Sequence, residues 1–185
     1  MSLWKVLKSS NLFQSGFFRL RVDECELPDK RVMPRYYVLE FPDWVNVVPV
    51  TADGQIILLD QYRHAAGTDF IEVPGGSTNP GGEDPLMAGR RELLEETGFE
   101  AEEWISCGFH YPNPALQNNK MFTYLALSCQ KTSEPSLDPF ECLTVKTMPV
   151  QEAFDRFFAG EFKHSLIAAS LSLAIAPLRA RGLIK

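Results

Sequence analysis

The sequence predicts an α+β fold, in which a mixed central sheet packs between helices and a small antiparallel sheet precedes it. Alternating apolar and polar residues, separated by turn signals, dominate the first part of the chain. One helical pattern, with a proline at its start and a glycine after its end, stands in the middle, and two more close the chain. Because strands and helices do not alternate regularly, we expect a mixed sandwich and not a series of βαβ units.

The N-terminal residues 3–41 are expected to form three strands, at 4–8, 17–22 and 35–41. The residues expected to turn the chain between them are Asn11, Gly16, Asp23 and Pro28. A sheet this small is not stable alone and often makes an oligomer contact. We therefore expect an N-terminal β appendage at 1–41 that forms a dimer contact, followed by a main domain at 42–185.

The main domain is expected to combine further strands with the helices. The strands are predicted at 45–50, 55–62, 70–73, 104–110, 121–127 and 143–147, and the helices at about 85–97, 150–159 and 164–179. A polar loop that contains proline is expected at 130–140. The residues predicted on the apolar or small-residue face of the last helix are Leu166, Ala169, Ser170, Leu173 and Ala174.

The composition limits the possible classes of function. The 185-residue chain is 45% hydrophobic, which is enough for a buried core. Its net charge of −6 argues against nucleic-acid binding, which requires a basic surface. Four scattered cysteines without a CxxC pair predict reduced thiols and not a zinc site or a disulfide framework. Because we find neither a membrane-spanning segment nor a signal peptide, we expect a soluble, cytoplasmic protein that does not associate with membranes.

Three glutamates lie close together on the predicted central helix. Glu92 and Glu96 are four residues apart and Glu95 lies beside them, so their carboxylates share one face. Like charges at this spacing destabilise a helix by about 0.2–0.5 kcal/mol per pair. A hard divalent cation would reverse that interaction, because Mg²⁺ binds carboxylate oxygens and keeps water and phosphate as its other ligands. The cluster therefore predicts a metal site and not merely a solvated acidic surface.

The segment around these glutamates resembles the Nudix box, the signature of the Nudix hydrolases. Its second half reads Arg91-Glu92-Leu93-Leu94-Glu95-Glu96-Thr97-Gly98-Phe99, and Glu83 stands at the required seven-residue gap. Phe99 replaces the usual aliphatic residue. Six residues in place of five separate Gly76 from Glu83, so the loop carries one extra residue. The resemblance implies an α/β/α sandwich with a mixed central sheet.

The resemblance also implies roles for the box residues. Glu92 and Glu96 would bind Mg²⁺ or Mn²⁺, and Glu95 would be a further ligand or would position the attacking water. The backbone carbonyl at Gly75 would add a ligand, since glycine allows close approach. Arg91 would pair with a glutamate and hold the helix against the loop. The reaction implied is hydrolysis of a nucleoside diphosphate linked to another group, with the metal neutralising the diphosphate and activating water.

Residues outside the box are similar to the ADP-ribose pyrophosphatase and nucleotide-sugar hydrolase branch of the family. The segments concerned are Gln61-Tyr62-Arg63 and Glu72-Val73-Pro74-Gly75-Gly76. In that branch the arginine at the position of Arg63 contacts the substrate phosphates, while Glu72 would either bind ribose or serve structurally. Pro114, sixteen residues after Gly98, resembles a proline associated with ADP-ribose specificity in the family, although an ordinary turn containing proline and asparagine is the simpler interpretation.

Members of that branch are commonly homodimers in which an aromatic residue of the partner stacks on the base. Tyr37 is our candidate for this contact, with Tyr36 and Phe18 as alternatives. Core packing is the competing interpretation for each of the three.

The general base of that branch lies on the loop before the last helices. That loop contains Glu134, Asp138 and Glu141, and we favour Glu141 because it leads into the following strand. His164 stands at the start of the last helix, where it would cap the helix or reach the site, and an exposed histidine without a role is the simpler interpretation.

These expectations define one leading function and its alternatives. The leading function is metal-dependent hydrolysis of ADP-ribose or a related nucleoside diphosphate sugar to a nucleoside monophosphate and a sugar phosphate. The first alternative keeps the chemistry but acts on a nucleoside triphosphate, a dinucleoside polyphosphate or a CoA derivative. The second is a non-catalytic module that senses a nucleotide. The preferred base and sugar and the number of metal ions stay open.

Overall fold

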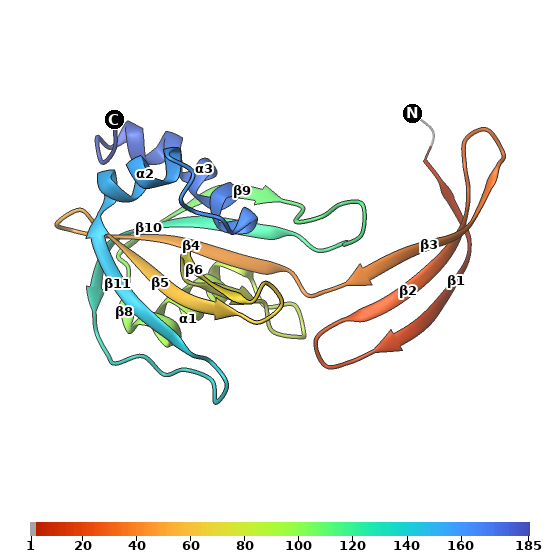
Figure 1. Cartoon of the computed structure of the whole chain (residues 1–185), viewed down its shortest axis with the longest axis horizontal. Helices are drawn as coiled ribbons and strands as arrows, with labels where there is room; N and C mark the ends of the chain where they lie inside the picture. Colours follow the sequence, from red (N-terminus) through yellow and green to blue (C-terminus); the bar gives the residue numbers. More distant parts are fainter. Residues whose placement is uncertain (1–2) are drawn as a thin grey trace. The chain divides into compact units, whose positions relative to one another are not determined.

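The computed structural model describes residues 3–185 and arranges them in eleven strands and three helices (Figure 1). The strands are β1 (Lys5–Gln14), β2 (Arg19–Glu26), β3 (Val32–Glu40), β4 (Trp44–Thr51), β5 (Gln55–Arg63), β6 (Thr68–Glu72), β7 (Gly75–Ser77), β8 (Phe99–Glu100), β9 (Glu103–His110), β10 (Met121–Lys131) and β11 (Leu143–Pro149). The helices are α1 (Pro85–Thr97), α2 (Val150–Phe158) and α3 (Ser165–Ala180). This order confirms the predicted α+β class. None of the helices among residues 3–185 is long and apolar enough to cross a membrane.

The chain forms two compact units. The first contains the described residues up to Asp43 together with Tyr111–Lys120, and the second contains Trp44–His110 and Met121–Lys185. In the first unit, β1, β2 and β3 form an antiparallel sheet in that order. The Leu39 N–H donates to the Leu116 carbonyl at 2.8 Å, so the structure groups 111–120 with this sheet, whereas the sequence left that segment in the main domain.

Two of the predicted turn residues in the first unit lie within strands. Asn11 is part of β1, where a register shift between Asn11 and Phe13 takes up the irregularity. Asp23 is part of β2 and is buried, because the Ser9 hydroxyl and the Arg21 guanidinium both donate to its carboxylate. The prediction of turns at Asn11 and Asp23 was wrong. Both residue types favour turns locally, but pairing between the strands of the sheet stabilises the extended conformation at these positions.

The second unit is built on a mixed sheet of eight strands. The strand order is β11-β5-β4-β10-β8, with β6 paired to β5, β7 paired to β4 and β9 paired to β10. Only β4 and β10 run parallel among the pairings that the structure gives for this sheet, in the described part of the chain. Helix α1 packs on one face, and α2 and α3 cover the other (Figure 1). The predicted α/β/α sandwich is therefore confirmed.

Strand β4 is buried on both faces of this sheet. Val45 and Val47 face α1, where a Cβ on Gly89 would lie 3.2 Å from a methyl group of each. Val48 and Val50 face the opposite side and join the core under α2 and α3. Burying a valine side chain stabilises a fold by roughly 1.5–3 kcal/mol, so a continuous apolar run suits this central position.

Helix α1 begins and ends where the sequence predicts. The Asp84 side chain accepts from the N–H of Leu86 at 2.9 Å, and Pro85 opens the first turn. Gly98 ends the helix in the left-handed region with φ 74°. Its carbonyl accepts from the N–H groups of Thr132 and Ser133, so the loop after β10 is attached to the end of α1.

Helix α3 uses a different face from the one that the sequence predicts. The residues that it buries are Ile167, Ser170, Leu171, Ala174 and Leu178. Leu166, Ala169 and Leu173 are only half-buried, so the prediction was right for Ser170 and Ala174 and wrong for these three. The pattern allowed both faces, and packing against β4 and β10 selected one of them. The short strands β7 and β8 also lack a sequence signal of their own.

Candidate active site

The glutamates of α1 lie against the glycine strand β7. Glu92 and Glu96 are buried, whereas the side chain of Glu95 is partly exposed. The Gly75 N–H donates to Glu96 Oε2 at 2.8 Å. A Cβ on Gly76 would lie only 2.6 Å from the carboxyl carbon of Glu92. Gly76 therefore lets the backbone approach the Glu92 carboxylate more closely than any side chain would permit, while the Gly75 N–H holds Glu96.

Arg91 connects α1 to the loop that precedes it. Its Nη1 donates to Glu92 at 2.8 Å and to Glu95 at 3.0 Å. Its Nη2 donates to the Ser77 carbonyl at 2.9 Å, and the guanidinium also contacts both carboxylate oxygens of Glu83. Burial would lower the pKa of Arg91, but the bonds to Glu83 and the charge of Glu92 outweigh it and raise the pKa. One guanidinium thus joins three carboxylates and a backbone carbonyl.

The extra residue in the loop does not displace Glu83. Asn79 donates its N–H to Glu83 Oε2 at 2.7 Å, so the loop closes on this carboxylate. Gly81 and Gly82 have φ of 104° and 88°, and nothing lies within 4 Å of a Cβ built on either. The additional length is therefore taken up by an open two-glycine turn, while Glu83 still reaches Arg91.

Burial disfavours the ionised form of the two buried carboxylates, Glu92 and Glu96. Burial raises the pKa of Glu96 to about 9, against the opposing effect of the Gly75 N–H. Burial likewise raises the pKa of Glu92, although Arg91 partly offsets it. Buried carboxylates of this kind ionise readily only beside a cation, and oxygen donors suit hard divalent ions. The carboxylates of α1 and the backbone of β7 therefore fit a divalent metal.

The possible ligands are engaged with other groups in this structure. Within residues 3–185, no three His, Cys, Asp or Glu side chains are already gathered as a metal-binding group. Glu92 and Glu95 accept from Arg91, and Glu96 accepts from Gly75.

Arg63 and Glu72 form an ion pair in the same unit. Arg63 Nε and Nη2 donate to the two carboxylate oxygens of Glu72 at 2.7 and 2.6 Å. The Glu72 side chain is 3% exposed and that of Arg63 is 44% exposed, so the guanidinium keeps a free side. The bonds to Glu72 raise the pKa of Arg63, and the charges of Glu96 and Glu141 add to the effect. Arg63 thus lies within the field of the box carboxylates.

His164 caps the last helix, which was one of its two predicted roles, and the charges of Arg63 and Glu72 act on it. Its Nδ1 accepts from the Leu166 N–H at 3.2 Å and caps α3. Its ring meets Phe70, on β6, edge-on at 5.6 Å between centroids. Burial lowers the pKa of His164, while Glu72 and Arg63 act on it in opposite directions. Its position before Ser165 is the signal that indicates a helix cap.

Glu141 lies on a loop that is held against α1. The Ser136 N–H donates to the Glu95 carbonyl at 2.7 Å. The charge of Glu141 contributes to the raised pKa of both Glu92 and Glu96. Glu134, an alternative base, instead pairs with Lys131 at the surface. Of these two, Glu141 is the one whose charge acts on the box.

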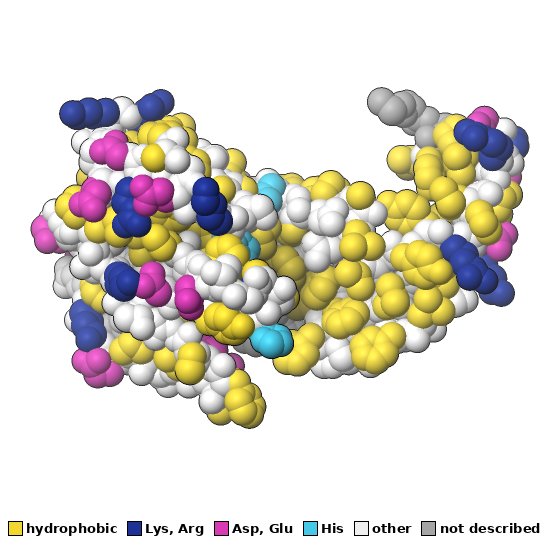
Figure 2. All heavy atoms as spheres, in the orientation of Figure 1, with side chains coloured by type: hydrophobic (Ala, Val, Ile, Leu, Met, Phe, Trp, Pro, Cys, Tyr) yellow, Lys and Arg dark blue, Asp and Glu magenta, His cyan; other side chains and the backbone are white. Residues whose placement is uncertain are grey.

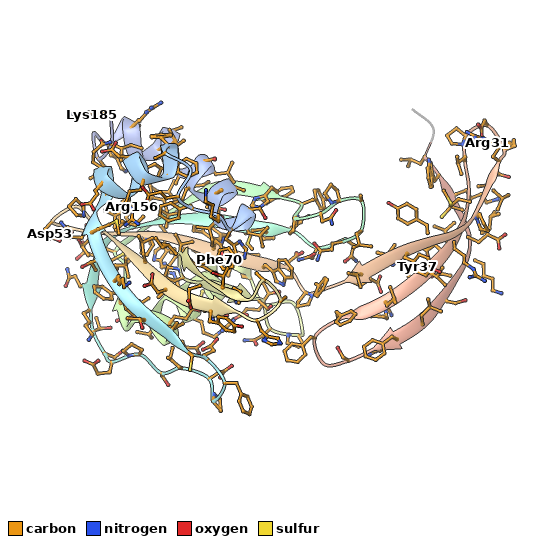
Figure 3. The ribbon with its side chains drawn as sticks, viewed as in Figure 1. Arg31, Tyr37, Asp53, Phe70, Arg156 and Lys185 are labelled. Atoms are coloured by element: carbon orange, nitrogen blue, oxygen red, sulfur yellow. The ribbon has the colours of Figure 1, made fainter. Side chains whose placement is uncertain are left out.

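Tyr37 and Pro114 belong to the first unit, whereas the box belongs to the second. Tyr37 lies on β3 and is partly exposed (Figure 3). Pro114 lies in the segment that packs on the three-stranded sheet, where the Tyr36 hydroxyl donates to the Ala115 carbonyl at 2.8 Å. Phe18 stacks on Phe41 with 5.5 Å between ring centroids.

The chain is similar to known proteins in both of its parts. Residues 4–39 match the nucleoside diphosphate sugar hydrolase N-terminal domain, and residues 41–169 match the NUDIX domain. A methanol dehydrogenase activator of Bacillus methanolicus is 30% identical over 151 residues, which cover 80% of each chain. An ADP-ribose pyrophosphatase of Mycobacterium tuberculosis is 28% identical over 169 residues, covering 91% of this chain and 81% of that protein.

The fold has a close structural counterpart. The crystal structure of an ADP compounds hydrolase matches with a TM-score of 0.85 and 22% identity, covering 99% of this chain and 98% of the other. At 22% sequence identity, this structural similarity establishes that the two chains share a fold and nothing further. The NUDIX domain match extends over more than half of the chain and includes α1 with all its carboxylates. The chain therefore belongs to the NUDIX family and is a pyrophosphohydrolase.

Proposed function

We propose that this protein hydrolyses the diphosphate bond of ADP-ribose, or of a related nucleoside diphosphate sugar, to a nucleoside monophosphate and a sugar phosphate. The observation that carries the proposal is the packing of the Glu92 and Glu96 carboxylates against the Gly75–Gly76 backbone. The match of residues 4–39 to a nucleoside diphosphate sugar hydrolase domain supports the substrate class. Relatives named ADP-ribose pyrophosphatase, from M. tuberculosis and Bacillus subtilis, support it further.

NUDIX hydrolases generally use divalent metals, and we propose Mg²⁺ or Mn²⁺ here. Glu92, Glu96 and Glu95, with the backbone carbonyl of Gly75, would hold the ion. When bound, it would neutralise the diphosphate and make water a better nucleophile. The buried carboxylates and their raised pKa values support this assignment.

The chain's own residues would divide the remaining work. Arg63 would bind a substrate phosphate with its free side, while Glu72 orients the guanidinium. Arg91 would keep α1 against its loop. Water would add its oxygen to one phosphorus, and the bond from that phosphorus to the bridging oxygen would break. Glu141 would take the proton of the water, and the departing phosphate would keep the bridging oxygen.

The first unit would supply the remaining contacts. We propose that Tyr37 stacks on the base and that Pro114 contributes to the substrate side, in a homodimer. Large apolar side chains gather on this unit, as Figure 2 shows over the three-stranded sheet, and they support the proposed dimer contact. Between residues 3 and 17, the large apolar side chains exposed by 44% or more are Leu3, Trp4, Val6, Leu7, Leu12, Phe13 and Phe17.

A substrate panel with and without metal tests the proposal. We expect ADP-ribose plus Mg²⁺ to yield AMP and ribose phosphate, and EDTA to reduce this release to background until Mg²⁺ is restored. Product chromatography on ADP-ribose, nucleotide sugars, triphosphates, dinucleoside polyphosphates and CoA derivatives gives the measurement. Faster cleavage of one of the last three groups would favour the first alternative. Metal-independent nucleotide binding by calorimetry, with no turnover, would favour a sensing module.

Arg63→Ala should weaken substrate binding and also destabilise the fold. Losing a charge-assisted contact to phosphate is expected to raise KM about tenfold. The change also leaves the buried carboxylate of Glu72 without its partner, which should lower the free energy of unfolding by about 1–2 kcal/mol. The loss is smaller than the roughly 3–5 kcal/mol of a fully buried pair because the Arg63 side chain is partly exposed. Steady-state kinetics and urea unfolding measure the two effects.

The double variant Arg63→Ala/Glu72→Gln separates the two roles of Arg63. It removes the unpaired charge, so unfolding stability should largely recover while KM stays high. If KM returns to the wild-type value together with stability, Arg63 serves only as the partner of Glu72.

A further inference from the structure

A small polar cluster lies inside the apolar layer between the sheet and α3. Asn46 on β4 is 5% exposed, and Thr123 on β10 and Ser170 on α3 are both 0% exposed. Asn46 Nδ2 donates to Ser170 Oγ at 2.9 Å, and the Thr123 hydroxyl donates to the same oxygen at 3.0 Å. We call these three residues the buried polar cluster.

Stability alone does not explain the buried polar cluster. Burying a polar group is unfavourable unless it is hydrogen-bonded, and a bonded set is often no more stable than apolar residues of the same shape. The neighbouring buried positions of α3, Ile167, Leu171 and Ala174, are all apolar. Apolar residues at positions 46, 123 and 170 together would therefore be compatible with this layer, whereas a change at one position alone leaves its buried partners unpaired.

The position of the cluster in the sheet indicates another role. Asn46 pairs with Gly75 of β7 on one side and with Thr123 of β10 on the other. A Cβ on Gly75 would lie 2.6 Å from Asn46 Oδ1, so the amide of Asn46 lies directly against the Gly75 backbone. Because Asn46 Nδ2 is engaged by Ser170, its oxygen is the end that faces Gly75.

Gly75 connects this face of the sheet to the other. Its N–H donates to Glu96 of α1 at 2.8 Å, and α1 packs on the face opposite to α3. A change in the orientation of the Asn46 amide would therefore move the Gly75 peptide and, through it, the carboxylate of Glu96.

We propose that the buried polar cluster positions the Gly75 peptide and Glu96 from behind the sheet, so that Asn46, Thr123 and Ser170 are positioning residues for the metal ligands. The inference rests on the proposed function, which assigns Gly75 and Glu96 to the metal. Partners that orient ligands in this way typically contribute about 10–100-fold to metal affinity.

Ser170→Ala tests the inference, because it removes the oxygen that both partners use. We expect the dissociation constant for Mn²⁺, measured by electron paramagnetic resonance, to rise about tenfold. In the metal-free protein, the Gly75 amide should exchange its hydrogen faster relative to the Ile57 amide, measured by NMR. Ser172→Ala is the matched control, since that exposed hydroxyl on the same helix donates only to the Ala168 carbonyl in the described contacts.

Two variants of Thr123 keep the test decisive if Ser170→Ala does not fold. Thr123→Val keeps the shape and removes the hydroxyl, so it should weaken Mn²⁺ binding, whereas Thr123→Ser should bind like the wild type. The contrary result is that the folded variants unfold at lower temperature but bind Mn²⁺ within about twofold of the wild type and keep the same exchange rate of the Gly75 amide relative to Ile57. In that case the cluster is only structural and the inference is wrong. Wild-type protein that binds no Mn²⁺ would instead overturn the proposed function, and this inference with it.

Discussion

Glu96→Gln should lower kcat for ADP-ribose by at least about a hundredfold, because even residues behind a metal ligand contribute about 10–100-fold. Glu96 is the most deeply buried of the three clustered glutamates and is held by the Gly75 N–H. Glutamine has nearly the same shape as a protonated glutamate, so the variant should fold normally. Steady-state kinetics at saturating Mg²⁺, together with thermal unfolding, would measure both properties.

Glu100→Gln provides the matched control for this change. Glu100 lies four residues later in the short strand β8 and is exposed. The same chemical change there should leave kcat and KM unaltered. Near-normal turnover by Glu96→Gln would contradict the assignment of Glu96 as a metal ligand.

Gly76→Ala should also lower activity strongly while leaving the fold in place. The new methyl group would lie 2.6 Å from the carboxyl carbon of Glu92 and 2.9 Å from its Oε2. A glutamate side chain can move aside, so the collision would displace Glu92 and not the backbone. We expect kcat/KM to fall about 10–100-fold with weaker Mn²⁺ binding, measured by kinetics and electron paramagnetic resonance.

Gly16→Ala is the corresponding control among the glycines. Nothing lies within 4 Å of a Cβ at Gly16, and its φ is not in the left-handed region. It should therefore behave like the wild type in both measurements. If Gly76→Ala retained full activity and metal affinity, Glu92 would not need its present position for catalysis.

Local signals were sufficient for the box helix. The cap at Asp84, the proline at its start and Gly98 at its end act within one turn of the helix, so the sequence predicts the bounds of α1 correctly. The 3.6-residue period likewise predicts that Glu92 and Glu96 share a face. The same period was ambiguous for α3, because both faces of that helix contain apolar and small residues.

The ion pair between Arg63 and Glu72 shows the limit of such reasoning. The sequence identified both residues but not their bond, which depends on the register between β5 and β6. The raised pKa of Glu96 has the same origin, since burial by the whole unit produces it. A pattern of residues contains the donors and charges, but not the distances between them.

The sequence by itself determined the family, the fold class and the helix that bears the carboxylates, because these depend on spacing within short segments. The tertiary structure determines which groups contact the carboxylates of Glu92, Glu95 and Glu96. Glu96 meets the backbone of Gly75 across 21 residues of sequence, and Asn46 meets Ser170 across 124. Contacts of that separation arise only when strand register and helix packing bring distant segments together. The chemistry of the site is therefore encoded locally, while its geometry is set by the whole sandwich.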